Sequence, residues 1–174
     1  MEHVAFLLGI NVGKRIVKMA DLKAVVEQAG YRDVRTYLAS GNVRFEAGKA
    51  TASSIVKKLE PLLERKFGFK IEVIVRTLPE LETMLKADPF KKIPVTKNTR
   101  LYVTFLSAEP SKTERARKMS EQFEILKVTP GEVYSHLEIT SELKTPDIMK
   151  ALGSSYGKKI TTRNWNTIRK IASA

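Results

Sequence analysis

Cysteine is absent from the 174 residues, which excludes disulfides, thiolate metal sites and a cysteine nucleophile. The two histidines, His3 and His136, stand alone and form no HExxH or other metal-ligand spacing. No apolar run approaches the roughly 18 residues that a membrane span needs, and the first residues lack the basic start of a secretory signal. We therefore expect a cytoplasmic protein with no membrane partner, no metal and no cofactor.

Acidic residues are absent after Asp147, although the chain carries 19 in all. Six cations follow that aspartate: Lys150, Lys158, Lys159, Arg163, Arg169 and Lys170. The formal net charge is +12, so this C-terminal stretch supplies half of it. Such a field attracts phosphates and polyanions, but a lysine-rich surface kept in solution by its charge has the same composition. Both interpretations stay open.

Hydrophobic periodicity in the first 76 residues predicts the order β-α-β-β-α-β, which is that of a ferredoxin-like unit. The predicted elements are a strand at 4–8, a helix at 19–29 ended by Gly30, strands at 34–39 and 43–46 around a tight turn at Ser40-Gly41-Asn42, a helix capped by Ser53 or Ser54, and a strand at 71–76. Pro61 lies inside the second helix and is expected to kink or split it.

The pattern repeats after a short helix near Leu81–Leu85 and a proline-containing loop at 88–98. The predicted elements of the second half are a strand at 101–106, a polar helix at 112–120, a hairpin of 123–128 and 133–139, a helix at 146–152, and a basic terminal helix capped by Thr161 or Thr162 where a last strand is expected. We predict an α+β protein of two pseudo-duplicated ferredoxin-like halves, with 1–76 and 100–174 joined by a connecting segment at 77–99.

The first candidate site is the glycine- and cation-containing loop at 9–18. Three residues separate Gly9 from Gly13, and Arg15 follows Lys14, whereas a Walker A loop needs four residues between its glycines and a Ser or Thr after the Lys. The spacing therefore argues against nucleotide hydrolysis of the P-loop type. The loop still offers backbone N–H groups and cations to an anion. The candidate ligand-binding residues here are Asn11, Gly13, Lys14, Arg15 and Lys18, with Ser40 and Asn42 added if the fold brings their turn close. Alternatively, the glycines only let the chain turn sharply after the first strand.

The second candidate site is the stretch Thr161-Thr162-Arg163-Asn164-Trp165-Asn166-Thr167, which contains the only tryptophan. Trp165, Ile168 and Ile171 share one helix face, and the simplest interpretation is that this face packs on a sheet. The start of the same helix can also bind an anion. The candidate ligand-binding residues are Arg163, Asn164, Trp165 and Asn166.

Three functional hypotheses follow from these features. The leading one is a binding protein for a phosphate-bearing or otherwise anionic ligand, either nucleic acid or a nucleotide. The second is an enzyme that acts on a small polar metabolite or nucleotide, although no catalytic constellation is visible in the sequence. The third is an interaction protein whose motifs only fix the packing of the two halves. The sequence does not decide the oligomeric state.

Several stretches together resemble a bacterial family, domain of unknown function 1697. They are Gly9-Ile10-Asn11-Val12-Gly13, Met19-Ala20-Asp21-Leu22, Thr36-Tyr37 through Ser40-Gly41-Asn42-Val43, Phe67-Gly68-Phe69, Asp88-Pro89-Phe90 and Thr161 through Thr167. The resemblance implies a cytosolic α+β protein of two ferredoxin-like halves and no established activity, cofactor or substrate. The family signature has a basic residue before Gly-Ile-Asn, where this chain has Leu8.

Overall fold

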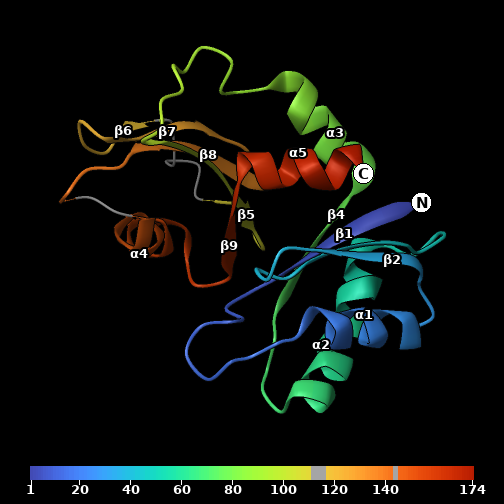
Figure 1. Cartoon of the computed structure of the whole chain (residues 1–174). Helices are drawn as coiled ribbons and strands as arrows, with labels where there is room; N and C mark the ends of the chain where they lie inside the picture. Colours follow the sequence, from blue (N-terminus) through green and yellow to red (C-terminus); the bar gives the residue numbers. More distant parts are fainter. Residues whose placement is uncertain (111–116, 143–144) are drawn as a thin grey trace. The chain divides into compact units, whose positions relative to one another are not determined.

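The chain folds as an α+β protein with two antiparallel sheets (Figure 1). The computed structural model describes residues 1–110, 117–142 and 145–174. These residues divide into two compact units, one of Met1–Met84 with Ile171–Ala174 and one of Leu85–Lys170. The first division falls within the helix Leu78–Ala87 (α3), and the second falls within the last helix of the chain.

The first unit is built on a four-stranded sheet of order β2-β3-β1-β4. Its elements are β1 Glu2–Leu7, α1 Met19–Gln28, β2 Arg32–Tyr37, β3 Asn42–Glu46, α2 Ala52–Phe67, β4 Val73–Thr77 and the beginning of α3. Every strand pair in this sheet is antiparallel. All six elements predicted up to residue 76 exist, with boundaries shifted by a few residues.

The core of the first unit lies between its sheet and the helices α1 and α2, which Figure 1 shows together on one face. Alternate residues of β1 point into this core, so Ala5 and Leu7 pack with the apolar faces of the two helices. Ile10 and Val17 belong to the same cluster. The loop at 9–18 is therefore anchored in the core near both of its ends.

Helix α2 differs from the prediction at its start and at Pro61. Its N-cap is Thr51, whose Oγ1 accepts the backbone N–H of Ser54 at 3.2 Å, rather than Ser53 or Ser54. Gly68 ends the helix in the left-handed conformation. The helix runs unbroken through Pro61, so a split there is wrong. Pro61 is exposed, and water can satisfy the carbonyl group that loses its partner on that side.

The hairpin of β2 and β3 also differs from the prediction. Strand β2 ends at Tyr37 and pairs it with Asn42, so a four-residue loop at 38–41 replaces the tight turn predicted at Ser40-Gly41-Asn42. Asn42 is a strand residue, opposite Phe6 of β1. Its side-chain Nδ2 donates to the Tyr37 carbonyl at 2.7 Å and closes the loop.

The second unit contains a sheet of order β6-β7-β8-β5-β9, all antiparallel. Its elements are β5 Thr99–Leu106, the two-residue β6 Arg117–Lys118, β7 Phe123–Val128, β8 Glu132–Glu138, α4 Thr145–Tyr156, β9 Ile160–Asn164 and most of α5 Trp165–Ser173. One face carries a core in which Tyr102, Leu106 and Leu137 pack with Ile148 and Leu152 of α4.

The terminal motif begins as a strand, which corrects the prediction of a helix capped by Thr161 or Thr162. Strand β9 pairs with β5 along its whole length and supplies the last strand that the sequence seemed to lack. β-Branched residues favour strands, and the hydroxyl groups of Thr104 and Thr162 meet across the pair at 2.8 Å. The helix predicted at 112–120 is wrong at Arg117–Lys118, which form strand β6. Residues 112–116 of that prediction lie outside the residues that the structure describes.

Arg44 fixes the C-terminal residues to the first unit. Its guanidinium donates to both carboxylate oxygens of Glu2 at 2.8 Å. Its Nη1 also donates to the backbone oxygens of Ile171, at 2.8 Å, and Ala174, at 2.6 Å. A cation at the end of α5 satisfies unpaired carbonyl groups and complements the helix dipole. The hydrogen bonds from Arg44 lower the pKa of the Glu2 carboxyl below its ordinary value of 4.5.

We expect Arg44→Met to lower the free energy of unfolding by about 2–3 kcal/mol, because it leaves the carbonyl groups and Glu2 without their donor. Glu2→Gln should cost about 1 kcal/mol at neutral pH. The folded-state pKa of Glu2 lies below its unfolded value. The contribution of the Glu2 carboxylate to the free energy of unfolding is therefore fully present above pH 4.5 and is lost as the pH falls through the folded-state pKa.

Urea denaturation of both variants and the wild type at neutral and acidic pH measures these effects. The difference between wild type and Glu2→Gln should shrink as the solution is acidified. A difference that is constant with pH would contradict the assigned role of the Glu2 carboxylate.

Candidate ligand-binding site

The predicted site residues fall into two groups, one in each compact unit. Asn11, Gly13, Lys14, Arg15, Lys18, Ser40 and Asn42 belong to the first unit, and Arg163, Asn164, Trp165 and Asn166 to the second. Each group is assembled by contacts within its own unit.

Asn11 binds the backbone of its own loop and of the β2–β3 turn. Its Oδ1 accepts the N–H of Val17 at 2.8 Å, and its Nδ2 donates to the carbonyl groups of Val17, at 3.1 Å, and Ala39, at 2.5 Å. The fold thus brings the turn next to the first loop. Both hydrogens of the Asn11 amide are used within the protein, so Asn11 holds the loop in place.

Arg15 is likewise engaged by neighbouring backbone. Its Nε donates to the Gly9 carbonyl at 2.6 Å, its Nη2 donates to the Lys70 carbonyl at 2.7 Å, and its guanidinium lies 4.5 Å from the centre of the Phe69 ring. This cation ties the loop to the segment after α2, where the family-like stretch Phe67-Gly68-Phe69 lies. It is a structural clamp.

The turn at Ser40-Gly41-Asn42 is also held by internal bonds. Asn42 is fully buried, and its Nδ2 donates to Ser40 Oγ at 2.9 Å as well as to Tyr37. Gly41 has φ +79°, and a Cβ at this position would lie 2.5 Å from Ile10 Cδ1. The glycine therefore permits both the left-handed backbone and the close approach of the first loop.

Asn11 and Ser40 are exposed although they take part in these hydrogen bonds, and Gly13, Lys14 and Lys18 are exposed members of the first group whose side chains are not engaged in the contacts above. Gly13 has φ +58° and no atom near its absent Cβ. The first group is thus mainly a scaffold that presents two exposed lysines, and the interpretation that its glycines serve the turn accounts for most of its contacts.

The second unit contains a hollow of about 270 Å³ beside the start of α5. Its polar lining consists of Asp88, Lys91, Thr99, Asn164, Asn166 and Arg169. Its apolar lining consists of Phe90, Ile93, Val95, Leu101 and Trp165. Two of the family-like stretches, Asp88-Pro89-Phe90 and Thr161 through Thr167, are more than 70 residues apart in the sequence and both contribute to this hollow.

An aromatic cluster holds these two stretches together. The Trp165 ring lies edge to face with Phe90, with ring centres 5.1 Å apart, and with Tyr134 of β8 at 6.1 Å. The ring centres of Phe90 and Tyr134 are also 6.1 Å apart. Trp165 is 1% exposed, so the anchoring role expected for it and a place in the hollow coexist. Such edge-to-face pairs add about 0.5–1.5 kcal/mol to the burial of their area.

Asp88 and Arg169 bring opposite charges into the lining. Arg169 Nη2 lies 3.6 Å from Asp88 Oδ2. Asp88 has φ +33°, and its Oδ1 accepts the N–H of Phe90 at 3.2 Å. Asn164 accepts the N–H of Asn166 at 2.9 Å through its Oδ1, which leaves its Nδ2 as the donor for a guest. Among the described residues, no hydrogen bond of that Nδ2 is found.

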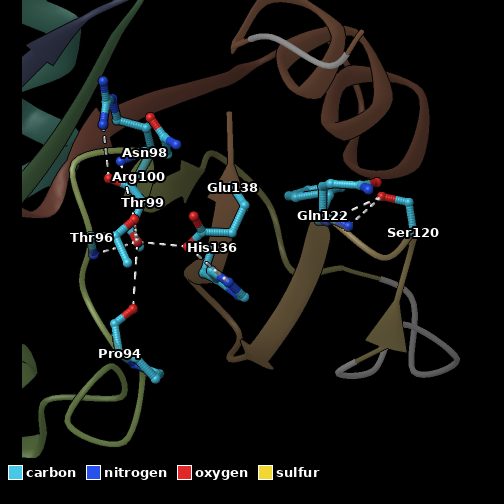
Figure 2. A network of polar contacts seen from close by, with 10 residues as sticks. Pro94, Thr96, Asn98, Thr99, Arg100, Ser120, Gln122, His136 and Glu138 are labelled. Atoms are coloured by element: carbon cyan, nitrogen blue, oxygen red, sulfur yellow. Dashed lines mark hydrogen bonds and ion pairs between the residues drawn. The ribbon is translucent and has the colours of Figure 1, made fainter. Parts of the chain in front are cut away.

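Thr99 connects the hollow to a polar network at the adjoining ends of β5 and β8 (Figure 2). Its Oγ1 donates to Glu138 Oε1 at 2.6 Å and accepts a hydrogen bond from the backbone N–H of Thr96 at 2.8 Å. His136 Nε2 lies 3.8 Å from the same carboxylate oxygen. The side chains of Thr99, His136 and Glu138 share the sheet face of Leu101, since Thr99 pairs with Glu138 and Leu101 with His136.

Arg163 does not line the hollow. It lies on β9 opposite Val103, is 7% exposed, and donates from Nη1 to Thr161 Oγ1 at 2.6 Å and to the Thr162 carbonyl at 3.0 Å. Burial lowers the pKa of the Arg163 guanidinium to about 10. It therefore stays protonated at neutral pH and is a buried cation of the sheet.

Sequence reasoning missed Asp88, Phe90, Lys91 and Arg169 as parts of this site. Asp88-Pro89-Phe90 is one of the stretches that carry the family resemblance, but the sequence does not show that this loop contacts the start of α5. Within the described ranges, no group of three or more acidic or histidine side chains is arranged to hold a metal ion. The same residues include no helix long and apolar enough to cross a bilayer.

The two antiparallel sheets and the mixed polar and apolar hollow define a small α+β protein with a candidate site in its second unit. The chain belongs to the family described as "Protein of unknown function (DUF1697)", whose profile matches residues 1–134. The resemblance inferred from the sequence is thereby confirmed, although the terminal motif lies beyond the matched residues.

A solved structure with a similar fold is that of the conserved bacterial protein SP0830 from Streptococcus pneumoniae. The similarity has a TM-score of 0.69 at 21% sequence identity and covers 99% of this chain and 96% of that one. At this identity the likeness establishes the fold alone. No curated protein matches the chain.

We expect Gly41→Ala and Gly13→Ala to separate backbone strain from close packing in the first unit. Both residues have positive φ, so each alanine should cost about 1–2 kcal/mol from conformation. Only at Gly41 does the new methyl group meet Leu7 and Ile10, which adds about 1–3 kcal/mol of overpacking. Thermal or urea unfolding measures both, and equal losses of stability would contradict the close approach of loop and turn.

Proposed function

We propose that the protein binds a small ligand with an anionic group in the hollow beside the start of α5. The observation that carries this proposal is the convergence of Lys91, Arg169 and Asn164 on one cavity with an apolar wall. Lys91 and Arg169 are cations, and the Asn164 amide has a donor to offer. A few placed polar groups among apolar and aromatic side chains are typical of small-molecule sites.

The size of the hollow favours a small molecule over a nucleic acid. Ligand pockets usually measure about 300–1,000 Å³, and this one is close to the lower limit at about 270 Å³. A nucleic acid is bound along an extended basic surface with aromatic platforms, whereas Phe90 and Trp165 are buried here. The high net charge then serves to attract the anion and to keep the protein in solution.

We also infer that the two units are ferredoxin-like halves of a duplicated pattern. The first sheet has the order β2-β3-β1-β4, and the corresponding strands of the second have the order β7-β8-β5-β9. In each case the last strand follows a helix and pairs antiparallel with the first. This agreement supports halves at 1–76 and 100–174 with a connecting segment at 77–99. The hollow is then a feature of the second half and its connecting segment.

The test follows the single indole N–H resonance of Trp165, the only tryptophan, in ¹H–¹⁵N spectra during titration with inorganic phosphate, AMP and short carboxylates. At least one probe should shift it saturably. Lys91→Gln combined with Arg169→Gln should weaken that binding about tenfold or more, since each tenfold step corresponds to about 1.4 kcal/mol.

Lys92→Gln is the matched control, because it removes an exposed neighbouring charge that does not line the hollow. No response to any probe at millimolar concentration, or an equal loss of affinity in the control, would refute the proposal. Mass spectrometry of the bound probe after incubation distinguishes a binding protein from an enzyme that converts it.

A further inference from the structure

We infer that the ligand is zwitterionic, an aliphatic amino acid or a molecule with the same ammonium and carboxylate head. This inference rests on the proposed function, because it assigns the occupant of the same hollow. The observation that leads to it is the presence of Asp88 beside the cations. A site for a plain anion gains nothing from a carboxylate in its lining.

The ion pair of Asp88 and Arg169 is open to exchange with a guest. Its closest separation of 3.6 Å is longer than the 2.7–2.9 Å of a charge-assisted hydrogen bond. The side chains of Arg169 and Asp88 are 55% and 29% exposed, so water reaches both. Exposed pairs of this kind contribute little to stability, and a ligand that offers both charges can replace the contact without leaving either residue unpaired.

Asp88 retains acceptor capacity for a ligand ammonium. Oδ1 accepts one hydrogen bond from the Phe90 N–H, and Oδ2 faces Arg169. A carboxylate has about four lone-pair sites, so sites on both oxygens remain. Asp88 also occupies the left-handed region at φ +33° just before Pro89, and backbone strain of this kind clusters at ligand clamps.

The charge pattern disfavours a ligand that carries only an anion. An anion placed at Arg169 lies near the Asp88 carboxylate. Two like charges about 4 Å apart repel each other even near a protein surface. An ammonium group on the same ligand turns that repulsion into attraction. Arg169, Lys91 and the Asn164 Nδ2 can then bind the carboxylate while Asp88 binds the ammonium.

The apolar lining and the volume indicate the body of the ligand. Ile93, Val95 and Leu101 provide most of the accessible apolar surface, because the rings of Phe90 and Trp165 in the same lining are almost fully buried. The volume of about 270 Å³ limits the ligand to a small molecule. Leucine carries both charges on a small branched aliphatic body and is the probe chosen for this chemistry.

The experiment compares three probes of one skeleton by the Trp165 indole resonance and by calorimetry. L-Leucine carries both charges, 4-methylpentanoate lacks the ammonium, and 3-methylbutylamine lacks the carboxylate. Leucine should bind at least about tenfold more tightly than either. Asp88→Asn should abolish the preference for leucine over 4-methylpentanoate and strengthen the binding of 4-methylpentanoate, because the ligand carboxylate is no longer repelled. Asparagine keeps an oxygen for the Phe90 N–H and tolerates positive φ, so the variant is expected to fold.

Asp147→Asn is the control, because it removes the same charge from α4 outside the hollow, and it should leave leucine binding unchanged. Equal affinities for leucine and 4-methylpentanoate would overturn the inference of a zwitterionic ligand, as would a protein that binds phosphate or AMP but not leucine. Either result would leave the proposed anion site intact. If no probe binds, both are wrong.

Discussion

The contact between Trp165 and Phe90 is the interaction on which the candidate site depends. It joins the first residue of α5 to the loop after α3, with Tyr134 of the sheet completing the cluster. The solvent-accessible pair of Asp88 and Arg169 also joins the two lining segments. Because the tryptophan is buried, its packing is strong enough to hold a loop that carries Asp88 in a strained conformation.

The two units use their polar residues in different ways. In the first, Asn11, Arg15 and Asn42 bind backbone carbonyl groups of neighbouring segments, so an apparent phosphate loop is a device for turning the chain. In the second, Asp88 and Arg169 remain accessible, and Asn164 keeps a donor. A surplus of positive charge along the sequence therefore does not by itself indicate a site, and the difference lies in which polar groups the fold leaves unused.

Much of the fold was predictable because buried segments repeat their apolar residues with the period of a helix or a strand. The helices α1 and α2 and the strands β1, β7 and β8 follow this rule. Strand β9 was missed because its threonines suit an N-cap as well as a strand, and pairing with β5 decided between them. The loop between β2 and β3 was predicted as a tight turn at Ser40-Gly41-Asn42. It is longer, because the side chain of Asn42 binds the Tyr37 carbonyl and closes it.

The sequence alone determined the α+β class, the family and the surplus of positive charge, because composition and local pattern suffice for these. Tertiary structure decided which motifs meet. It joined Asp88-Pro89-Phe90 to the start of α5 and buried Arg163 in the sheet, where it does not line the hollow. Contacts between residues more than 70 positions apart depend on strand pairing and packing, and local preferences carry no information about them.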